Sequence, residues 1–221
     1  MKLVYENMEH ILRFGEGYIN ELIVENKKMF FKMVNSVCMQ ADGLQGEFVM
    51  SISDKVVEFG KNAEVIIQFA PFQMNRKSLL TKLHASLEQR ATDADFYLET
   101  LEILKGLESF VSRLAGDLPF EIDCKKISIG PVIRALSPEV DEEDKNTLEK
   151  IFSYMEIVRE LDRERLFVMI NMRTYFSYEE MQEFVKSANL HGFKVLLLEN
   201  IAFPLIENTK RYVIDDDLCE F

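Results

Sequence analysis

The chain has little glycine, and it has none where a nucleotide-binding protein would need it. Only 9 of its 221 residues are glycine. Residues 19–24 are expected to form a buried strand that runs into a helix, and the junction, residues 25–28, reads Glu-Asn-Lys-Lys. A P-loop requires GxxxxGK[ST] at such a junction, because only glycine lets successive backbone N–H groups wrap a phosphate. The sequence therefore excludes an ordinary P-loop here.

Cysteine and long apolar runs are also scarce. The three cysteines, Cys38, Cys124 and Cys219, are far apart and form no CxxC pair, which indicates reduced thiols rather than a disulfide framework. Residues 1–12 include acidic side chains where a signal peptide would need an apolar stretch. No apolar run reaches the roughly 18 residues of a membrane span. We expect a cytoplasmic protein that does not bind membranes.

Motifs for hydrolytic or metal chemistry are missing as well. His10, His84 and His191 lie far apart, without HxxxH or HExxH spacing, and there is no GxSxG elbow. Surface or capping roles are therefore predicted for the histidines. The sequence predicts no catalytic residues.

The acidic net charge of the chain limits how it could bind nucleic acid. The formal net charge is −12 and the pI is about 4.8. Nucleic-acid affinity comes largely from lysines and arginines that displace counterions, so a surface that binds polyanions everywhere is excluded. Any nucleic-acid contact must be a local basic patch on an acidic protein.

The apolar pattern predicts an α/β protein with a parallel-rich sheet. Short runs of apolar residues, typical of strands buried on both faces, occur at residues 48–52, 65–70, 166–170 and 195–198. Helical periodicity fills the middle of the chain, where Asn75 is predicted to be the N-cap of a helix over residues 76–90. We therefore predict a head domain of degenerate P-loop NTPase type, residues 1–73 and 161–221, and an inserted α-helical leg, residues 74–160.

Two groups of polar residues are candidates for a site. Asn171 and Glu199 follow two predicted strands, where a doubly wound sheet usually places its ligand contacts. Without a phosphate loop, a strand-end cap or hydrogen bond is the favoured interpretation. A second group is basic, lies between acidic stretches, and is either a solvated face or a contact for duplex backbone, since few aromatic residues interleave with it. Its members are Lys55, Lys61, Arg76, Lys77, Lys82 and Arg90.

Several segments resemble one known family, in order along the chain. Asn75 followed by residues 80–88, Leu-Thr-Lys-Leu-His-Ala-Ser-Leu-Glu, resembles the N-(x)n-LKLIHGDLE helix of the subtype II-A CRISPR spacer-acquisition protein of the Csn family. The other matching segments are residues 121–123, 127–136, 166–171, 196–199 and 212–217. The resemblance spans nearly the whole chain.

The resemblance implies a function that does not need catalysis. Proteins of this family are expected to form a homotetrameric ring whose positively lined hole holds double-stranded DNA, near its ends, beside the CRISPR integrase pair and the effector nuclease. Lys55 and Lys61 match lysines of the family's basic hairpin, and Lys82 matches a lysine of its leg helix. Arg76 and Lys77 extend the predicted DNA-binding patch in this chain.

The chain departs from the family at its calcium sites. Where the family reads approximately E-L-D-L-E-Y-D-E, residues 119–126 read Pro-Phe-Glu-Ile-Asp-Cys-Lys-Lys. Glu121 and Asp123 remain as possible calcium ligands, whereas Lys125 and Lys126 replace acidic positions. Calcium takes six to eight oxygen ligands, and a nearby ammonium repels it. We expect one of these lysines to supply the charge that calcium gives the relatives.

Two other functional classes remain open at this point. One is a degenerate P-loop ATPase or nucleotide-sensing regulatory protein, which titration with magnesium ATP would reveal. The other is a purely structural partner-binding module, which would shift no duplex. We expect no bound nucleotide.

Overall fold

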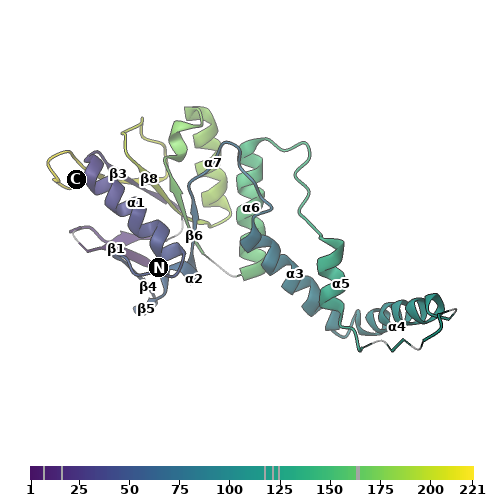
Figure 1. The fold of residues 1–221 in the computed structure, drawn as a ribbon. Helices are drawn as coiled ribbons and strands as arrows, with labels where there is room; N and C mark the ends of the chain where they lie inside the picture. The colour runs from purple at the N-terminus through teal and green to yellow at the C-terminus, as the bar shows by residue number, and fades with distance from the viewer. Residues whose placement is uncertain (7, 16, 117, 121, 124, 163–164) are drawn as a thin grey trace. The chain divides into compact units, whose positions relative to one another are not determined.

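The computed structural model describes residues 1–221 other than 7, 16, 117, 121, 124 and 163–164 (Figure 1). The chain divides into two compact units. Unit 1 comprises Met1–Phe72 and Asp144–Phe221, and unit 2 comprises Gln73–Glu143. Helix α6 (Thr147–Asp162) therefore belongs to unit 1, although the sequence analysis assigned most of it to the leg. It does so because Ile151, Tyr154, Met155 and Val158 are buried in the core of unit 1.

Unit 1 is built on a five-stranded parallel sheet. Its strands, in spatial order, are β6 (Ala63–Ile66), β7 (Leu166–Ile170), β8 (Lys194–Glu199), β3 (Ile19–Val24) and β9 (Thr209–Ile214). β3 and β7 are buried at every position, as expected for strands covered on both faces. The predicted α/β class with a parallel sheet drawn from both ends of the chain is confirmed.

A second, antiparallel sheet accompanies it. Its order is β2 (Leu12–Arg13), β1 (Lys2–Tyr5), β4 (Phe48–Ile52) and β5 (Lys55–Val57). The interpretation of residues 48–52 as a strand buried on both faces was wrong, since Val49 is 50% exposed. An apolar run cannot distinguish a central strand from one that uses a single face, because the tertiary environment decides which face is covered.

Different elements cover the two faces of the parallel sheet (Figure 1). Alternate side chains of a strand point to opposite faces. Leu22 and Val24 of β3 pack in one core with Met33 and Val37 of α1 (Lys27–Ala41) and with the antiparallel sheet. The other face is covered by helices, with α7 (Tyr178–Leu190) in contact with β3 and with α6. Two short elements complete unit 1, α2 (Phe59–Asn62) and η1 (Met172–Thr174).

Helices are the regular secondary structure of unit 2 in the part that the structure describes, and loops connect them. It contains α3 (Lys77–Thr92), α4 (Tyr97–Leu114) and α5 (Ile129–Leu136). Gly130 of α5 lies so close to α3 that a Cβ there would be 2.3 Å from the Glu88 carboxylate. A larger residue at this position would require the Glu88 side chain to move.

Asn75 is not the N-cap of α3. The cap position is Arg76, and Asn75 instead binds the chain that leaves unit 2. Its amide donates to the Val140 carbonyl at 2.9 Å and its Oδ1 accepts from the Val140 N–H, also at 2.9 Å. Glu142 strengthens this connection between the two chain segments, because its carboxylate accepts hydrogen bonds from the backbone N–H groups of Met74 and Asn75 at 3.0 and 3.1 Å. Several hydrogen bonds across the two chain segments outweigh a single capping bond.

None of the helices in the described ranges is both long enough and apolar enough to cross a membrane.

Candidate functional site

The junction between β3 and α1 is occupied by protein groups rather than prepared for a phosphate. Asn26 is the N-cap of α1, and its Oδ1 accepts from the Met29 N–H at 3.0 Å. Its amide donates to the Asp216 carbonyl at 2.8 Å, and the Glu25 N–H donates to the Ile214 carbonyl at 2.8 Å. Free N–H groups at a helix N-terminus are what binds an anion. Here the side chain of Asn26, rather than an anion, accepts a hydrogen bond at the N-terminus of α1, as the missing glycines suggested.

The strand-end residues are likewise used inside the fold. Asn171, in the left-handed region with φ of 54°, accepts a hydrogen bond from the Asn200 N–H at 3.2 Å. Glu199 is fully buried at the end of β8 and its Oε1 accepts from the Arg173 N–H at 3.1 Å. Both side chains join the loop after β7 to the loop after β8. The interpretation of these residues as strand-end hydrogen-bonding groups is confirmed.

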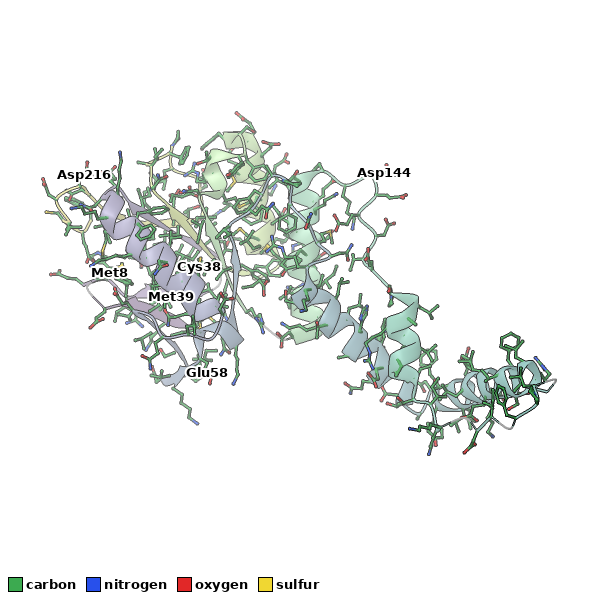
Figure 2. The ribbon with its side chains drawn as sticks, viewed as in Figure 1. Met8, Cys38, Met39, Glu58, Asp144 and Asp216 are labelled. Atoms are coloured by element: carbon green, nitrogen blue, oxygen red, sulfur yellow. The ribbon has the colours of Figure 1, made fainter. Side chains whose placement is uncertain are left out.

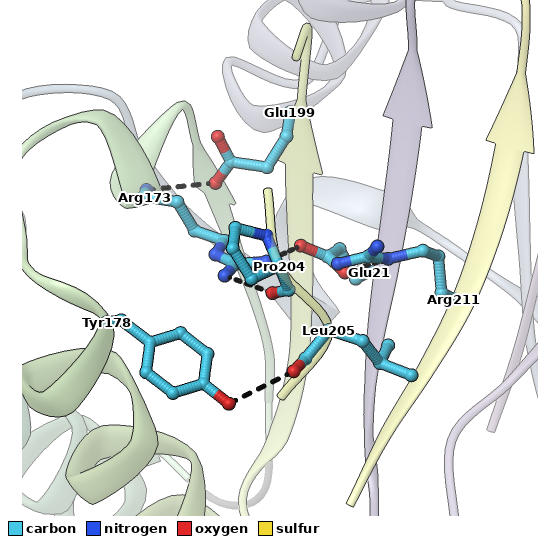
Figure 3. Close-up of polar contacts among 7 residues, drawn as sticks. All are labelled: Glu21, Arg173, Tyr178, Glu199, Pro204, Leu205 and Arg211. Carbon is cyan, nitrogen blue, oxygen red and sulfur yellow. Dashed lines mark hydrogen bonds and ion pairs between the residues drawn. The ribbon is translucent and has the colours of Figure 1, made fainter. Parts of the chain in front are cut away.

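A buried ionic cluster lies beside Glu199 (Figure 3). Glu21, fully buried in the middle of β3, binds Arg173 Nη1 at 2.5 Å and Arg211 Nε at 2.7 Å. Arg173 also donates from Nη2 to the Pro204 carbonyl at 2.7 Å and stacks on Phe203, 5.0 Å from the ring centre. The cluster thus ties η1, β3, β9 and the loop between β8 and β9 together.

The environment of this cluster changes the protonation of Glu199. Burial raises the pKa of Glu199 to about 8, and the charge of Glu21 adds to the effect, while the Arg173 N–H and guanidinium oppose it. Its Oε2 is buried and has no hydrogen-bond partner among the described residues. With a pKa of about 8 this carboxyl is mostly protonated near neutral pH, whereas a magnesium-dependent NTPase would place an ionised carboxylate at a strand end.

The sequence analysis missed the cluster, because Glu21 looked like one polar residue in an apolar strand. The signal was present in the sequence. A charge inside a strand that is otherwise buried requires an opposite charge, so Glu21 predicts an arginine or lysine partner. The identity of that partner could not be read, since Arg173 and Arg211 are 152 and 190 positions away.

The predicted DNA-binding residues are divided between the units. Lys55 in β5 and Lys61 in α2 lie in unit 1, and both are exposed. Lys61 binds Glu58 at 2.6 Å in an exposed pair, whereas Lys55 forms no ion pair with the residues that the structure describes. An exposed pair of this kind is worth less than about 1 kcal/mol, so Lys61 can exchange Glu58 for another anion.

The other three residues lie at the start of α3 in unit 2. Arg76 is partly exposed and donates from Nε to the Gln73 carbonyl at 3.1 Å. Lys77 is exposed, and Lys82 is partly exposed one turn further along. Leu79, the buried residue of α3, lies almost opposite Lys77 but only three residues before Lys82, which places Lys82 beside the buried side of the helix. Leu79 points inward as predicted, whereas Leu80, Leu83 and Leu87 are partly exposed. Lys77 lies on the solvent side and Lys82 at its edge.

The residues considered for calcium do not assemble a donor set in the described structure. Glu121 lies outside the described residues. Asp123 is exposed, as are Lys125 and Lys126. Within the described ranges, no three His, Cys, Asp or Glu side chains gather closely enough to hold a metal ion. Asp123, the one of the two candidate carboxylates that the structure describes, does not by itself form a calcium site.

The histidines have partners within the fold. His10 Nδ1 contacts Glu220 Oε2 at 2.9 Å, His84 Nε2 contacts the Pro138 carbonyl at 3.1 Å, and His191 Nδ1 contacts the Ser187 carbonyl at 2.9 Å. They lie in separate parts of the structure, which agrees with the structural roles predicted for them.

Unit 2 exposes an unusual amount of apolar surface along α4. Only Thr100 of this helix is buried. An apolar hollow of about 450 Å³ lies beside it, lined by residues of α3, α4 and α5 that include Leu87, Phe96, Ile103, Ile133 and Leu136. The large apolar side chains exposed on and next to α4 are Phe96, Tyr97, Leu98, Ile103, Leu107, Phe110, Val111 and Leu114.

The fold and site define an α/β protein whose parallel sheet lacks a phosphate-binding loop, with an all-helical second unit. A family model described as "CRISPR-associated protein (Cas_Csn2)" matches residues 40–218. The chain therefore belongs to the Csn2 family of CRISPR-associated proteins.

Individual relatives agree with this assignment. The chain is similar to a CRISPR-associated protein Csn2 of Enterococcus faecalis, with 24% identity over 157 residues, 69% of each protein. It is 22% identical over 153 residues to a Csn2 of Streptococcus agalactiae, covering 66% of this chain and 65% of that protein. The crystal structure of Stu0660 of Streptococcus thermophilus has a similar fold, with a TM-score of 0.57, 15% identity, and coverage of 90% of this chain and 68% of that one.

Proposed function

We propose that this protein binds double-stranded DNA without sequence preference and without catalysis, as a ring-shaped homotetramer that acts in CRISPR spacer acquisition beside the integrase pair and the effector nuclease. The site is a set of lysines and arginines that contact phosphates: Lys55, Lys61, Arg76, Lys77 and Lys82. The sheet of unit 1 serves as a degenerate P-loop platform that binds no nucleotide.

The observation that carries the proposal is the solvent exposure of these basic residues in a chain of the Csn2 family. Each of the five is at least partly exposed, and they lie on two separate elements of unit 1 and on α3. Phosphate contacts require side chains that reach into solvent and carry no information on base sequence. A net charge of −12 does not oppose such contacts, because a ring can carry its lysines inside and its acid outside.

The apolar surface of α4 supports the assembly. Phe96 is 52% exposed and Leu98 is 72% exposed, next to the apolar hollow of unit 2. Monomeric proteins rarely leave contiguous apolar patches of this kind in water, and such patches usually mark interfaces. A second copy of the chain, presenting the same apolar helix, is the occupant that a homotetramer supplies.

Charge reversal at two of the proposed contacts tests the DNA-binding function. Lys61→Glu and Lys82→Glu are each expected to weaken binding of a linear duplex at least tenfold at low salt, and to reduce the slope of log Kd against log salt by about 1. Binding is measured by mobility shift at two salt concentrations, with light scattering to show that the assembly is intact.

A matched control separates these contacts from general charge effects. Lys186→Glu makes the same change on the exposed side of α7 and should leave the affinity within about twofold. Equal weakening by all three variants would contradict a localised site. Failure of the unaltered protein to shift any linear duplex would contradict the function itself.

Ring assembly is expected to persist without calcium. Lys125 and Lys126 stand where the family carries carboxylates, so we propose that one of them provides positive charge in place of the ion. The particle mass, measured by light scattering, should then be the same in calcium and in chelator. A tetramer that dissociates in chelator would show that the ion is still required.

A further inference from the structure

Helix α1 differs in charge from the rest of the chain. Its 15 residues include three lysines and no acidic residue, in a protein with 38 acidic and 26 basic residues. Lys27, Lys28 and Lys32 are exposed, and none of them forms an ion pair with a described residue. These three remain available to an anion from outside.

The lysines share one side of the helix with an exposed phenylalanine. Lys28 and Lys32 are four residues apart, which places them one above the other on a helix, and Lys27 stands in the same relation to Phe31. Phe31 is 70% exposed, and Met39 is 39% exposed. Figure 2 labels Met39 further along α1. The opposite side of α1, with Met33 and Val37, is buried in the core. We call Lys27, Lys28, Phe31 and Lys32 the α1 ridge.

The position of the lysines costs helix stability. Lys27 and Lys28 occupy the first turn of α1, where acidic residues are absent. The helix dipole makes a cation at this end unfavourable and an anion favourable, by roughly 0.3–1 kcal/mol for each charge. A local preference that is violated twice in one turn is typical of a functional site. An anion that approaches these lysines would offset this unfavourable charge.

The α1 ridge and Lys61 lie near opposite ends of α1. α2 packs against the C-terminal end of α1 so closely that a Cβ on Gly60 would lie 2.6 Å from the Gln40 carbonyl oxygen and 2.9 Å from that of Ala41. Lys61 follows Gly60 and therefore lies near this end of α1. At 1.5 Å per residue, Lys28 is about 20 Å from it along the axis. This separation corresponds to roughly six phosphates of one DNA strand at about 3.4 Å each, so the ridge and Lys61 would contact different phosphates.

We propose that the α1 ridge is a phosphate-contacting strip for the backbone of duplex DNA, additional to Lys55 and Lys61. This inference rests on the proposed function and extends it to a helix that the family resemblance does not assign. The helix whose N-terminus would hold a nucleotide phosphate in an NTPase here has that end capped by Asn26. The lysines of α1 would instead contact phosphates along the backbone of duplex DNA.

The charge around Phe31 decides between DNA and an apolar partner. A protein that covered Phe31 with apolar groups would bury three unpaired ammonium groups beside it, which is costly. A phosphate backbone offers each lysine an anion and lets counterions be released. An anionic membrane surface shares this chemistry, so it is included in the test as a competing outcome.

The test compares variants of the full-length protein in binding a linear duplex. The triple variant Lys27→Gln, Lys28→Gln, Lys32→Gln removes the charge while keeping residues of similar helix propensity. Phe31→Ser removes the apolar group alone, and Lys186→Gln is the charge control on α7. Kd is measured by fluorescence anisotropy across a salt series, with circular dichroism and light scattering to establish that fold and assembly are unchanged.

Each result has one meaning. The inference expects the triple variant to bind more weakly and its slope of log Kd against log salt to fall by about 0.9 for each lysine that contacts a phosphate, with Lys186→Gln unchanged. A triple variant that behaves like the unaltered protein, while Lys61→Glu still weakens binding, overturns the α1 ridge and leaves the proposed function standing. Absence of duplex binding by the unaltered protein overturns both.

Two further outcomes count against DNA as the occupant. If Phe31→Ser abolishes binding and the lysine variant does not, the contact is apolar and the inference is wrong. The same holds if the unaltered protein sediments with phosphatidylserine vesicles and the triple variant loses that property while its affinity for the duplex is unchanged.

Discussion

Arg173→Met is expected to lower the free energy of unfolding by about 3–5 kcal/mol. Arg173 is 4% exposed and neutralises Glu21, which is fully buried in β3. Methionine keeps much of the volume, but among the residues described it leaves Glu21 with Arg211 alone as an ion-pair partner, and it leaves the Pro204 carbonyl without the Arg173 donor. Urea unfolding at a fixed protein concentration measures the loss, because assembly also contributes to apparent stability.

A double-mutant cycle shows whether the ion pair causes this effect. In a Glu21→Gln background no buried carboxylate remains uncompensated, so the cost of Arg173→Met should be smaller by at least about 1 kcal/mol. Arg211→Met is the comparison within the cluster, and since Arg211 is partly exposed its cost should be closer to about 1.5–3 kcal/mol. Equal costs of Arg173→Met in both backgrounds would show that Arg173 acts through packing instead.

Glu199→Gln is expected to stabilise the protein increasingly as the pH rises from about 5 to 8. The pKa of Glu199 is raised from 4.5 to about 8 in the folded state, so between these values the folded protein holds a proton that the unfolded chain releases. The stability from this group is therefore full below about pH 4.5 and is lost as pH rises toward 8. One protonation difference changes the free energy of unfolding by about 1.4 kcal/mol per pH unit.

The quantity to compare is the difference between two pH profiles. Other groups also titrate, so the unaltered protein and Glu199→Gln are unfolded in urea at matched pH values, and their free energies of unfolding are subtracted. The difference should grow steadily across the window and then level off above about pH 8. Glu207→Gln, at an exposed position in the loop after β8, is the control and should give a flat difference. Parallel profiles for Glu199→Gln would contradict a buried neutral carboxyl.

Local patterns in the sequence determined most secondary structure. Residues 19–24 and 166–170 were bounded as strands from their apolar composition, and the structure has the same bounds. Residues 195–198 lie within β8, whereas of residues 65–70 only the first two belong to β6. The missing glycines at residues 25–28 are a property of the chain alone and exclude an ordinary P-loop in any fold. The resemblance to the Csn family could also be found from the sequence, because motifs depend only on the order of residues along the chain. The family assignment confirms this resemblance.

Tertiary structure decided what depends on contacts between distant residues. The sequence could not tell that residues 48–52 pair with β1 outside the parallel sheet, that α6 joins unit 1, or that Asn75 binds Val140 rather than capping α3. Nor could it pair Glu21 with Arg173 and Arg211, because a buried charge states that a partner exists without stating where in the chain it lies. Periodicity and composition report on neighbours along the chain, whereas burial and ion pairing are settled by packing.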